Sequence, residues 1–211
     1  MTRVALVHAL RHSPPPIEAA FRAAWPQAVL MNLLDDSLSA DLAREGRLTP
    51  AMTDRFLALA RYAAGTGAQG ILFSCSAFGP CIEACARELS PLPVLKPNEA
   101  AIEEACAIGT RIGLLATFPG TIASMPAEFP PGVELRTSLA DGALAALDAG
   151  DVATHDRLAA EAALALGDCD VVLLGQFSLA RAAPLVAEAT GRPVVTTPAS
   201  AVRKLRRALG A

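Results

Sequence analysis

The chain has 211 residues, of which 53% are hydrophobic and 18% are charged, with a formal net charge of −3. This composition can bury a substantial core, which excludes a disordered chain. The slightly acidic balance and the 4% content of aromatic residues argue against nucleic-acid binding, which calls for a basic domain and stacking platforms. The length allows one domain or two of about 100 residues.

The N-terminus enters a strand-like run at Val4–His8 directly, without an apolar stretch followed by a small-residue cleavage site. No apolar run approaches the roughly 18 residues of a membrane span. The five cysteines are odd in number and lie among helix- and strand-like segments, unlike a secreted disulfide scaffold. We therefore predict a cytoplasmic protein with reduced thiols that binds neither nucleic acid nor a membrane.

Strand-like and helical segments alternate along the chain. The predicted strands are Val4–His8, Val29–Leu33, Ile71–Ser74, Pro93–Leu95, Arg111–Ala116, Val133–Thr137, Val171–Leu174 and Pro193–Thr196. The predicted helices are Ile17–Trp25, one starting near Leu38, Pro50–Ala64, Pro80–Leu89, Glu99–Ile108, Ala153–Leu166, Ala180–Ala189 and one from Pro198 onward. This alternation favours an α/β fold of parallel sheets with helices on both faces.

The two halves of the chain also resemble each other. Residues 69–75 correspond to residues 168–176, and after a helix each half reaches a similar Pro-Val pair, Pro93-Val94 and Pro193-Val194. We predict two pseudo-symmetric doubly wound lobes, residues 1–96 and 97–197, with the final helix, 198–211, packing back on the first lobe. Ligands bind beyond the carboxyl ends of parallel strands. The segments expected to line one pocket between the lobes are His8 with Arg11–Pro16, Asp35–Ser37, Cys75–Gly79, Thr117–Thr121, Gly175–Ser178 and Thr196–Ser200.

The segment Gly65–Gly70 matches the dinucleotide-binding pattern GxGxxG letter for letter. That fingerprint has to follow a strand and open a helix. Here the glycines end a helix and lead into a strand, so we interpret them as helix-stop and turn residues.

Cys75 lies at a strand-to-helix turn, with Pro80 in the first turn of the following helix. A thiol beside a helix N-terminus is expected to favour the thiolate form, and the same N–H donors could hold a carboxylate. We predict that Cys75 is functional. The remaining cysteines are interpreted as structural residues, and His155 is interpreted as a solvated one. No metal site is expected. Asp35–Ser37 either binds a substrate ammonium group or caps the helix near Leu38.

Four segments together resemble the aspartate/glutamate/hydantoin racemase superfamily, which also contains arylmalonate decarboxylase and maleate isomerase. They are Ile71–Pro80, Gly113–Phe118, Val172–Gln176 and Pro193–Thr196. The resemblance implies cofactor-free chemistry between two lobes, a small carboxylate substrate, and a homodimer as one assembly state. In the racemases of the superfamily two cysteines flank the substrate carbon. The first matches Cys75, but the position of the second holds Gln176.

An amide is neither an acid nor a base at accessible pH, although it can hydrogen-bond a developing enediolate. The leading hypothesis is therefore a racemase or isomerase that transfers a proton through Cys75, with Gln176 stabilising charge and a residue such as His8 as second base. The alternatives are a one-thiol decarboxylase, a cis–trans isomerase acting by covalent addition, and a carboxylate-binding protein without catalysis. The predicted substrate-binding residues are Ser76, Ala77, Thr117, Phe118, His8, Ser13, Gly175 and Phe177.

Overall fold

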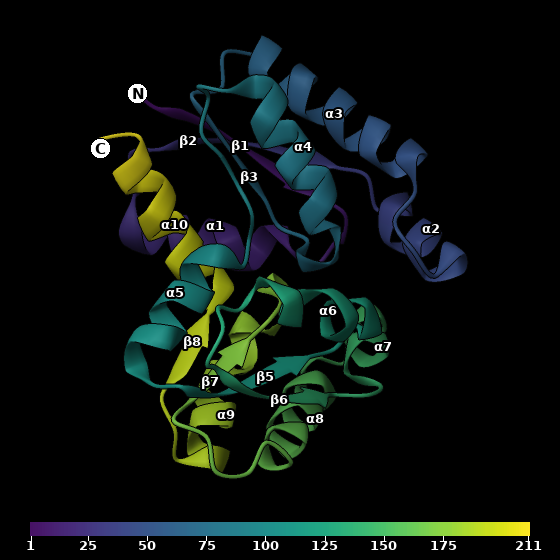
Figure 1. The fold of residues 1–211 in the computed structure, drawn as a ribbon, viewed down its shortest axis with the longest axis vertical. Coiled ribbons are helices and arrows are strands. Elements are labelled where there is room, and N and C mark those ends of the chain that lie inside the picture. Colours follow the sequence, from purple (N-terminus) through teal and green to yellow (C-terminus); the bar gives the residue numbers. More distant parts are fainter.

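The computed structural model describes residues 1–211 and has an α/β fold with two four-stranded parallel sheets (Figure 1). The first sheet has the order β2-β1-β3-β4 and contains β1 (Arg3–His8), β2 (Val29–Leu34), β3 (Gly70–Phe73) and β4 (Val94–Leu95). The second sheet has the order β6-β5-β7-β8 and contains β5 (Arg111–Ala116), β6 (Glu134–Leu139), β7 (Val171–Leu174) and β8 (Val194–Thr196). The two orders are equivalent, so the predicted pair of doubly wound sheets is confirmed.

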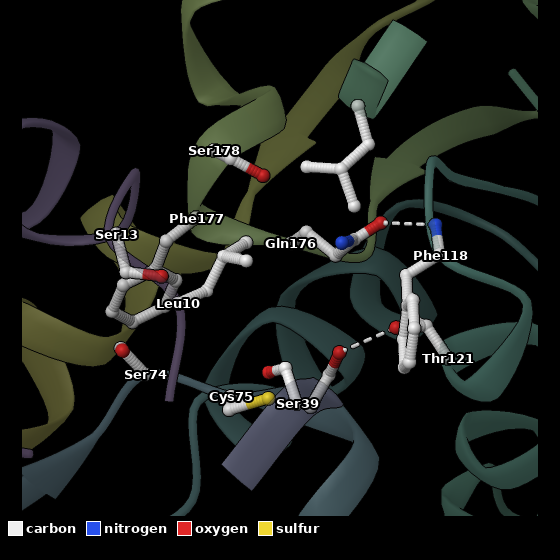
Figure 2. Close-up of a pocket in the computed structure, with 12 residues that line it drawn as sticks. Leu10, Ser13, Ser39, Ser74, Cys75, Phe118, Thr121, Gln176, Phe177 and Ser178 are labelled. Carbon is white, nitrogen blue, oxygen red and sulfur yellow. Dashed lines mark hydrogen bonds between the residues drawn. The ribbon is translucent and has the colours of Figure 1, made fainter. Parts of the chain in front are cut away.

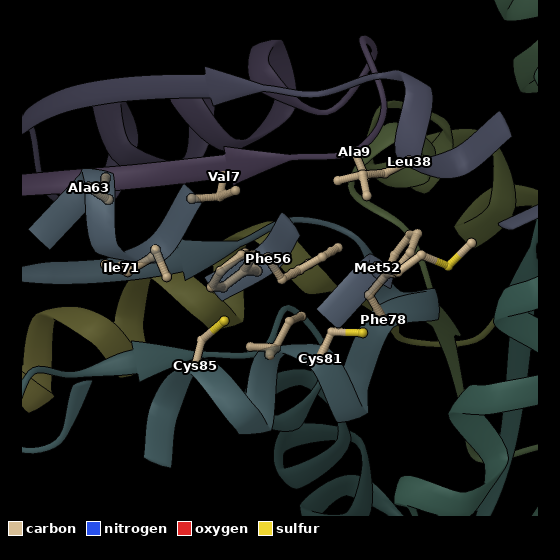
Figure 3. Close-up of a cluster of buried hydrophobic side chains, with 14 of the residues drawn as sticks. Val7, Ala9, Leu38, Met52, Phe56, Ala63, Ile71, Phe78, Cys81 and Cys85 are labelled. Atoms are coloured by element: carbon tan, nitrogen blue, oxygen red, sulfur yellow. The ribbon is translucent and has the colours of Figure 1, made fainter. Parts of the chain in front are cut away.

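Helices cover both faces of the first sheet. They are α1 (Pro14–Ala24), α2 (Ser37–Glu45), α3 (Pro50–Gly65) and α4 (Gly79–Leu89). Helices α3 and α4 pack together over one face, where Phe56 stacks on Phe73 and Phe78 with ring centroids 5.3 Å and 4.8 Å apart (Figure 3 shows Phe56 and Phe78 in this core). On the other face α1 packs against α10 (Thr197–Ala208), the last helix of the chain.

The second sheet is covered by α5 (Glu99–Ile108), α6 (Pro119–Ser124), α7 (Ala143–Asp148), α8 (Val152–Leu164) and α9 (Ala183–Thr190). Helix α8 packs between α7 and α9, while α5 covers the opposite face. Helix α10 contacts both α5 and α1, so the C-terminal segment ties the second lobe to the first. Both chain ends lie beside the first lobe (Figure 1).

Every predicted strand is present, with bounds shifted by two residues at most. The short helices α6 and α7 were not predicted, and the helix expected at Ala180–Ala189 begins as a 3₁₀ helix, Phe177–Ala182, before α9. The interpretation of Gly65–Gly70 is confirmed, because α3 ends at Gly65 and β3 begins at Gly70. No helix of the structure combines the length and apolar character needed to cross a bilayer.

The prediction of a solvated His155 is wrong, because its side chain is fully buried. His155 shares one face of α8 with Ala159 and Ala163, at spacings of four residues, and that face points at the core. Its Nδ1 atom lies 2.7 Å from a carboxylate oxygen of Asp156. The buried placement predicted for Cys81 and Cys85 is confirmed.

Candidate active site

Strand pairing places Cys75 and Gln176 at equivalent turns of the two sheets. Val7 pairs with Phe73 in the first sheet, and Leu115 pairs with Leu174 in the second. Cys75 lies two residues after Phe73, and Gln176 lies two residues after Leu174. Both have extended backbones, with φ/ψ of −112°/114° and −143°/146°, and both precede a 3₁₀ helix. They therefore lie at the switch points of their sheets, where ligands bind in doubly wound folds.

A cavity of about 50 Å³ lies between the two turns (Figure 2). Among the predicted site residues, it is lined by Cys75, Gln176, Ser13, Ser76, Phe118 and Phe177. The other lining residues are Leu10, Ser39, Ser74, Thr121, Leu144 and Ser178. The lining contains residues from both lobes, and Cys75 is its only ionisable side chain.

The remaining predicted residues lie around this cavity. Ala77 lines a neighbouring groove, His8 and Thr117 hydrogen-bond to the lining residues Ser74 and Gln176, and Gly175 directly precedes Gln176. Residues 35–37 and 196–200 do not line the cavity. Asp35 instead forms an ion pair with Arg55 at 2.5 Å and accepts a hydrogen bond from Ser37, and the N-cap residue Asp36 makes no side-chain cap, so the capping role is not observed. Binding of an ammonium group by this segment stays a prediction.

The surroundings of Cys75 favour its neutral thiol over the thiolate. Burial raises its pKa to about 11, and the Ala77 backbone and the Ser39 hydroxyl oppose this only partly. The expectation of a favoured thiolate is therefore contradicted. The main reason is burial, which penalises the charged form of the thiol. In addition, a 3₁₀ helix of three residues, Ser76–Phe78, follows Cys75, and α4 begins only at Gly79. The sulfur thus lacks the aligned N–H groups of a full helix N-terminus.

The side chain of Gln176 is fixed by its own lobe. Its Oε1 atom accepts hydrogen bonds from the Thr117 amide at 2.5 Å, the Thr117 hydroxyl at 3.1 Å and the Phe118 amide at 3.2 Å. Backbone N–H groups can only donate, so they require the amide oxygen at this position. The Nε2 atom makes no hydrogen bond within the protein, which leaves an N–H donor pair at the cavity wall (Figure 2).

Two serines complete the polar lining. The Ser76 hydroxyl lies 2.8 Å from the Thr121 hydroxyl and so joins the two lobes at the edge of the cavity. Ser178 is 1% exposed, and its hydroxyl has no hydrogen-bond partner in the protein. A buried polar group without a partner is costly, so Ser178 is a natural contact for a bound ligand.

Behind Ser74 a chain of hydrogen bonds leads from the buried His8 to the protein surface. The His8 Nδ1 atom is 2.7 Å from the Ser74 hydroxyl, and its Nε2 atom is 2.9 Å from Asn32 Oδ1. Asn32 in turn donates to a carboxylate oxygen of Glu18 at 2.8 Å. Burial lowers the pKa of His8, although Asn32 and Glu18 act in the opposite direction. His8 therefore acts on the cavity through Ser74 rather than by lining it.

A wider groove of about 540 Å³ lies beside the cavity, between the end of α2 and α6. It shares Phe118 with the cavity and is lined mainly by apolar residues, with Arg47 at its rim. No group of three or more His, Cys, Asp or Glu side chains lies together in a way that could hold a metal ion. The polar groups at the cavity suit a small organic acid, and the adjacent groove suits an apolar group on that acid.

Two further lining residues, Thr121 and Ser178, fall within segments that were predicted to line the pocket, Thr117–Thr121 and Gly175–Ser178. Four lining residues were not predicted at the site, and of these Ser74 carried a partial signal because it ends a predicted strand directly before Cys75. Leu10, Ser39 and Leu144 carried none. Ser39 reaches Cys75 from inside α2, and Leu144 belongs to a helix that was not predicted.

Two facing parallel sheets with a thiol at one switch point define an α/β protein of the racemase type. A family model described as Asp/Glu/Hydantoin racemase matches residues 15–205. The chain belongs to this family.

Solved structures show the same fold. Glutamate racemase from Francisella tularensis, in complex with D-glutamate, is 14% identical with a TM-score of 0.77, and the match covers 99% of this chain and 81% of that one. Allantoin racemase from Klebsiella pneumoniae is 21% identical with a TM-score of 0.74, covering 100% and 89%. Unliganded arylmalonate decarboxylase is 19% identical with a TM-score of 0.63, covering 100% and 94%. No curated protein matches the chain.

Proposed function

We propose that the protein is an enzyme that uses one thiol, Cys75, to transfer a proton at a carbon beside the carboxylate or carbonyl group of a small acid. The observation that carries this proposal is that Cys75 is the only ionisable side chain lining the cavity between the lobes. Proton transfer by a positioned side chain needs such a group within reach of the reacting carbon.

The site favours donation of a proton from Cys75 to a carbanion over removal of a proton from the substrate. With its pKa raised to about 11, Cys75 carries its proton at neutral pH and can donate it without prior activation. The negative charge of an enediolate would face the free N–H groups of Gln176 and the hydroxyl of Ser178. Preorganised donors of this kind stabilise charge that develops in a transition state.

Loss of carbon dioxide from a malonate-type acid would create such a carbanion. The carbon–carbon bond breaks, its electron pair stays on the remaining carbon as an enediolate, and the proton of Cys75 forms the new carbon–hydrogen bond. Water then returns a proton to the thiolate. This sequence needs a single acid, and the fold is shared with an arylmalonate decarboxylase.

Racemisation by two thiols receives no support from the equivalent position. Gln176 stands where a second thiol would be needed, and its amide can neither accept nor release a proton in this role. His8 is not a lining residue, so it does not supply the second base directly. A one-thiol reaction is therefore the mechanism that these side chains fit.

The test is incubation with amino acids, hydantoins, malonates and maleate in deuterated water. Incorporation of deuterium at the α-carbon, release of carbon dioxide and formation of fumarate distinguish proton exchange, decarboxylation and isomerisation. Cys75→Ala should reduce the observed reaction by at least about 100-fold. Cys106→Ala is the matched control, because Cys106 is also a partly buried free thiol but lies on α5, away from the cavity. Tight binding without any reaction, or full activity of Cys75→Ala, would contradict the proposal.

A further inference from the structure

A buried carboxyl group of the second lobe faces the first lobe near the segment that joins them. Glu128 ends the 3₁₀ helix Met125–Glu128, which follows α6, and its side chain is 14% exposed. A Cβ atom on Gly79, the first residue of α4, would lie 3.6 Å from Glu128 Oε1. The ammonium group of Lys96, between β4 and α5, lies 3.6 Å from Glu128 Oε2. Closure of the two lobes therefore removes this carboxyl group from water.

The hydrogen bonds at Glu128 leave two acceptor oxygens without a donor. Asn98 Nδ2 donates to Glu128 Oε1 at 3.0 Å. Glu128 Oε2 and Asn98 Oδ1 are both buried, and neither has a hydrogen-bond partner. Asn98 is 1% exposed and occupies the N-cap of α5, but its side chain does not cap that helix. The Asn98 amide thus contacts Glu128 instead, and each of the two side chains keeps one bare oxygen.

A single proton on Glu128 supplies the donor that both oxygens lack. A carboxylate only accepts hydrogen bonds, whereas a carboxylic acid has one O–H donor. An amide and a carboxylic acid pair through two hydrogen bonds, in which the acid O–H donates to the amide oxygen. Asn98 Nδ2 already makes one of these two bonds. The second bond would remove the cost of leaving two buried polar atoms unpaired.

The charged groups around Glu128 do not replace this proton. At 3.6 Å the Lys96 ammonium group is beyond hydrogen-bond distance, and it donates instead to Glu83 of α4 at 2.9 Å. Glu83 adds negative charge beside Glu128, and Glu99 of α5 acts on Lys96. Burial raises the pKa of Glu128 above its usual 4.5, and the opposing effects of Asn98 and Lys96 do not cancel this.

We infer that Glu128 is a proton-dependent latch between the lobes. With a proton, Glu128 pairs with Asn98 and fits the closed arrangement, in which α4 of the first lobe keeps water away from it. As a carboxylate, Glu128 is stabilised by water, so it favours an opened arrangement that gives access to the cavity between the lobes. The latch couples access to Cys75 to pH, whatever reaction the thiol performs.

The direction of this coupling follows from linkage. The closed protein binds the Glu128 proton more tightly than an opened protein, in which the exposed side chain has its ordinary pKa of 4.5. Lowering the pH therefore favours closed lobes, and raising it favours opening. The effect levels off above the raised pKa of the closed form, because Glu128 is then ionised in both arrangements.

The first measurement is the titration of Glu128 in the whole protein. Carbon NMR of a glutamate-labelled sample reports the protonation of each side-chain carboxyl group, and the signal that disappears in Glu128→Gln belongs to Glu128. We expect its midpoint to lie above 4.5. A midpoint at or below 4.5 would overturn the inference, because the closed protein would then prefer the carboxylate.

The second measurement is the access of a thiol reagent to Cys75. After treatment with dithiodipyridine, peptide mass spectrometry gives the labelling rate of Cys75 relative to Cys106, a thiol on α5 away from the cavity. Glu128→Gln mimics the protonated side chain, since its amide can both donate to Asn98 and accept from it. It should slow the relative labelling about fivefold at pH 7.5, the effect of one unpaired buried polar group. The slowing should shrink as the pH is lowered to 5, because the wild-type protein then gains the same pairing by proton uptake.

Glu83→Gln is the matched control. It removes a carboxylate from the same ammonium group of Lys96, but Glu83 is 50% exposed and has no bare buried oxygen. The relative labelling should change less than about twofold. Faster or unchanged labelling in Glu128→Gln, equal slowing by Glu83→Gln, or a slowing that does not depend on pH would contradict the inference. None of these rates requires turnover, so a failure of the proposed function leaves the test intact.

Discussion

The side-chain oxygen of Gln176 lies 2.5 Å from the amide nitrogen of Thr117, and the Thr117 hydroxyl donates to the same oxygen at 3.1 Å. The glutamine side chain thereby takes up hydrogen-bond donors at the end of β5 that a ligand could otherwise use. A substrate carboxylate was expected to bind Thr117, but it would meet the N–H groups of Gln176 instead. The second lobe contributes an amide donor where the first lobe contributes a thiol.

Gln176→Cys should add proton transfer on the second face of the substrate carbon. The change creates a thiol at the position equivalent to Cys75 and releases the Thr117 and Phe118 amides for a carboxylate. With a thiol on each side, we expect a single enantiomer of an accepted substrate or product to racemise, which the wild-type protein should not catalyse. Chiral chromatography after incubation in deuterated water measures both racemisation and exchange.

The control for this variant is Gln176→Ala, which removes the amide without adding a thiol. It should show no racemisation and slower one-face proton transfer, because the charge-stabilising donor is lost. Racemisation by Gln176→Ala, or by the wild-type protein, would show that the second base is a different residue.

The sequence predicted the fold well because turn residues mark where most of its strands and helices begin and end. Strands such as Arg111–Ala116 and Val171–Leu174 are apolar runs between turn residues, and the structure gives both with the predicted bounds. The helix Glu99–Ile108 also has the predicted bounds. The six-residue helices α6 and α7 were missed, because periodicity is hardly visible over so few residues.

The site was predictable only in part. Strand ends indicated Cys75 and Gln176, since topology alone places them at the sheet edges. Which neighbours face the cavity depends on the conformation of each turn and on helices from elsewhere in the chain. Ser39 approaches Cys75 from α2, and the role of Ser74 depends on the distant residues His8 and Asn32. Desolvation of the thiol, which decides its protonation, likewise follows from packing.

Alkylation of Cys75 by iodoacetamide should be slow at neutral pH. The thiolate is the reactive form, and burial raises the thiol pKa to about 11, so the rate should rise about tenfold per pH unit between pH 8 and 10. Peptide mass spectrometry gives the rate for Cys75 separately from the other four cysteines. A rate that reaches its plateau by pH 8 would indicate a stabilised thiolate and a role as base.

Acid should destabilise the fold through His8. The pKa of His8 is lowered by burial from 6.5, so the unfolded chain takes up a proton at a higher pH than the folded protein does. The stabilisation is complete above about pH 6.5 and is lost as the pH falls below it, with a slope of at most about 1.4 kcal/mol per pH unit from this one group.

Urea denaturation at several pH values between 7.5 and 5 measures this slope. His8→Gln cannot titrate at this position, so its slope over the same range should be smaller than that of the wild-type protein. Identical slopes would show that His8 takes up its proton equally in the folded and unfolded states, which would contradict a pKa lowered by burial.

Gly175→Ala should destabilise the second lobe. A Cβ atom at this position would lie 2.9 Å from Leu114 Cδ1, 3.2 Å from Met125 Sδ and 3.3 Å from the Leu115 carbonyl oxygen. Inserting a methyl group into such a packed region costs about 1–3 kcal/mol. Because Gly175 directly precedes Gln176, the displaced turn should also lower activity. Gly65→Ala is the matched control: nothing lies within 4 Å of its Cβ position at the end of α3. Urea denaturation should show a loss of stability for Gly175→Ala alone, and equal stability of the two variants would mean that the β7 turn relaxes without cost.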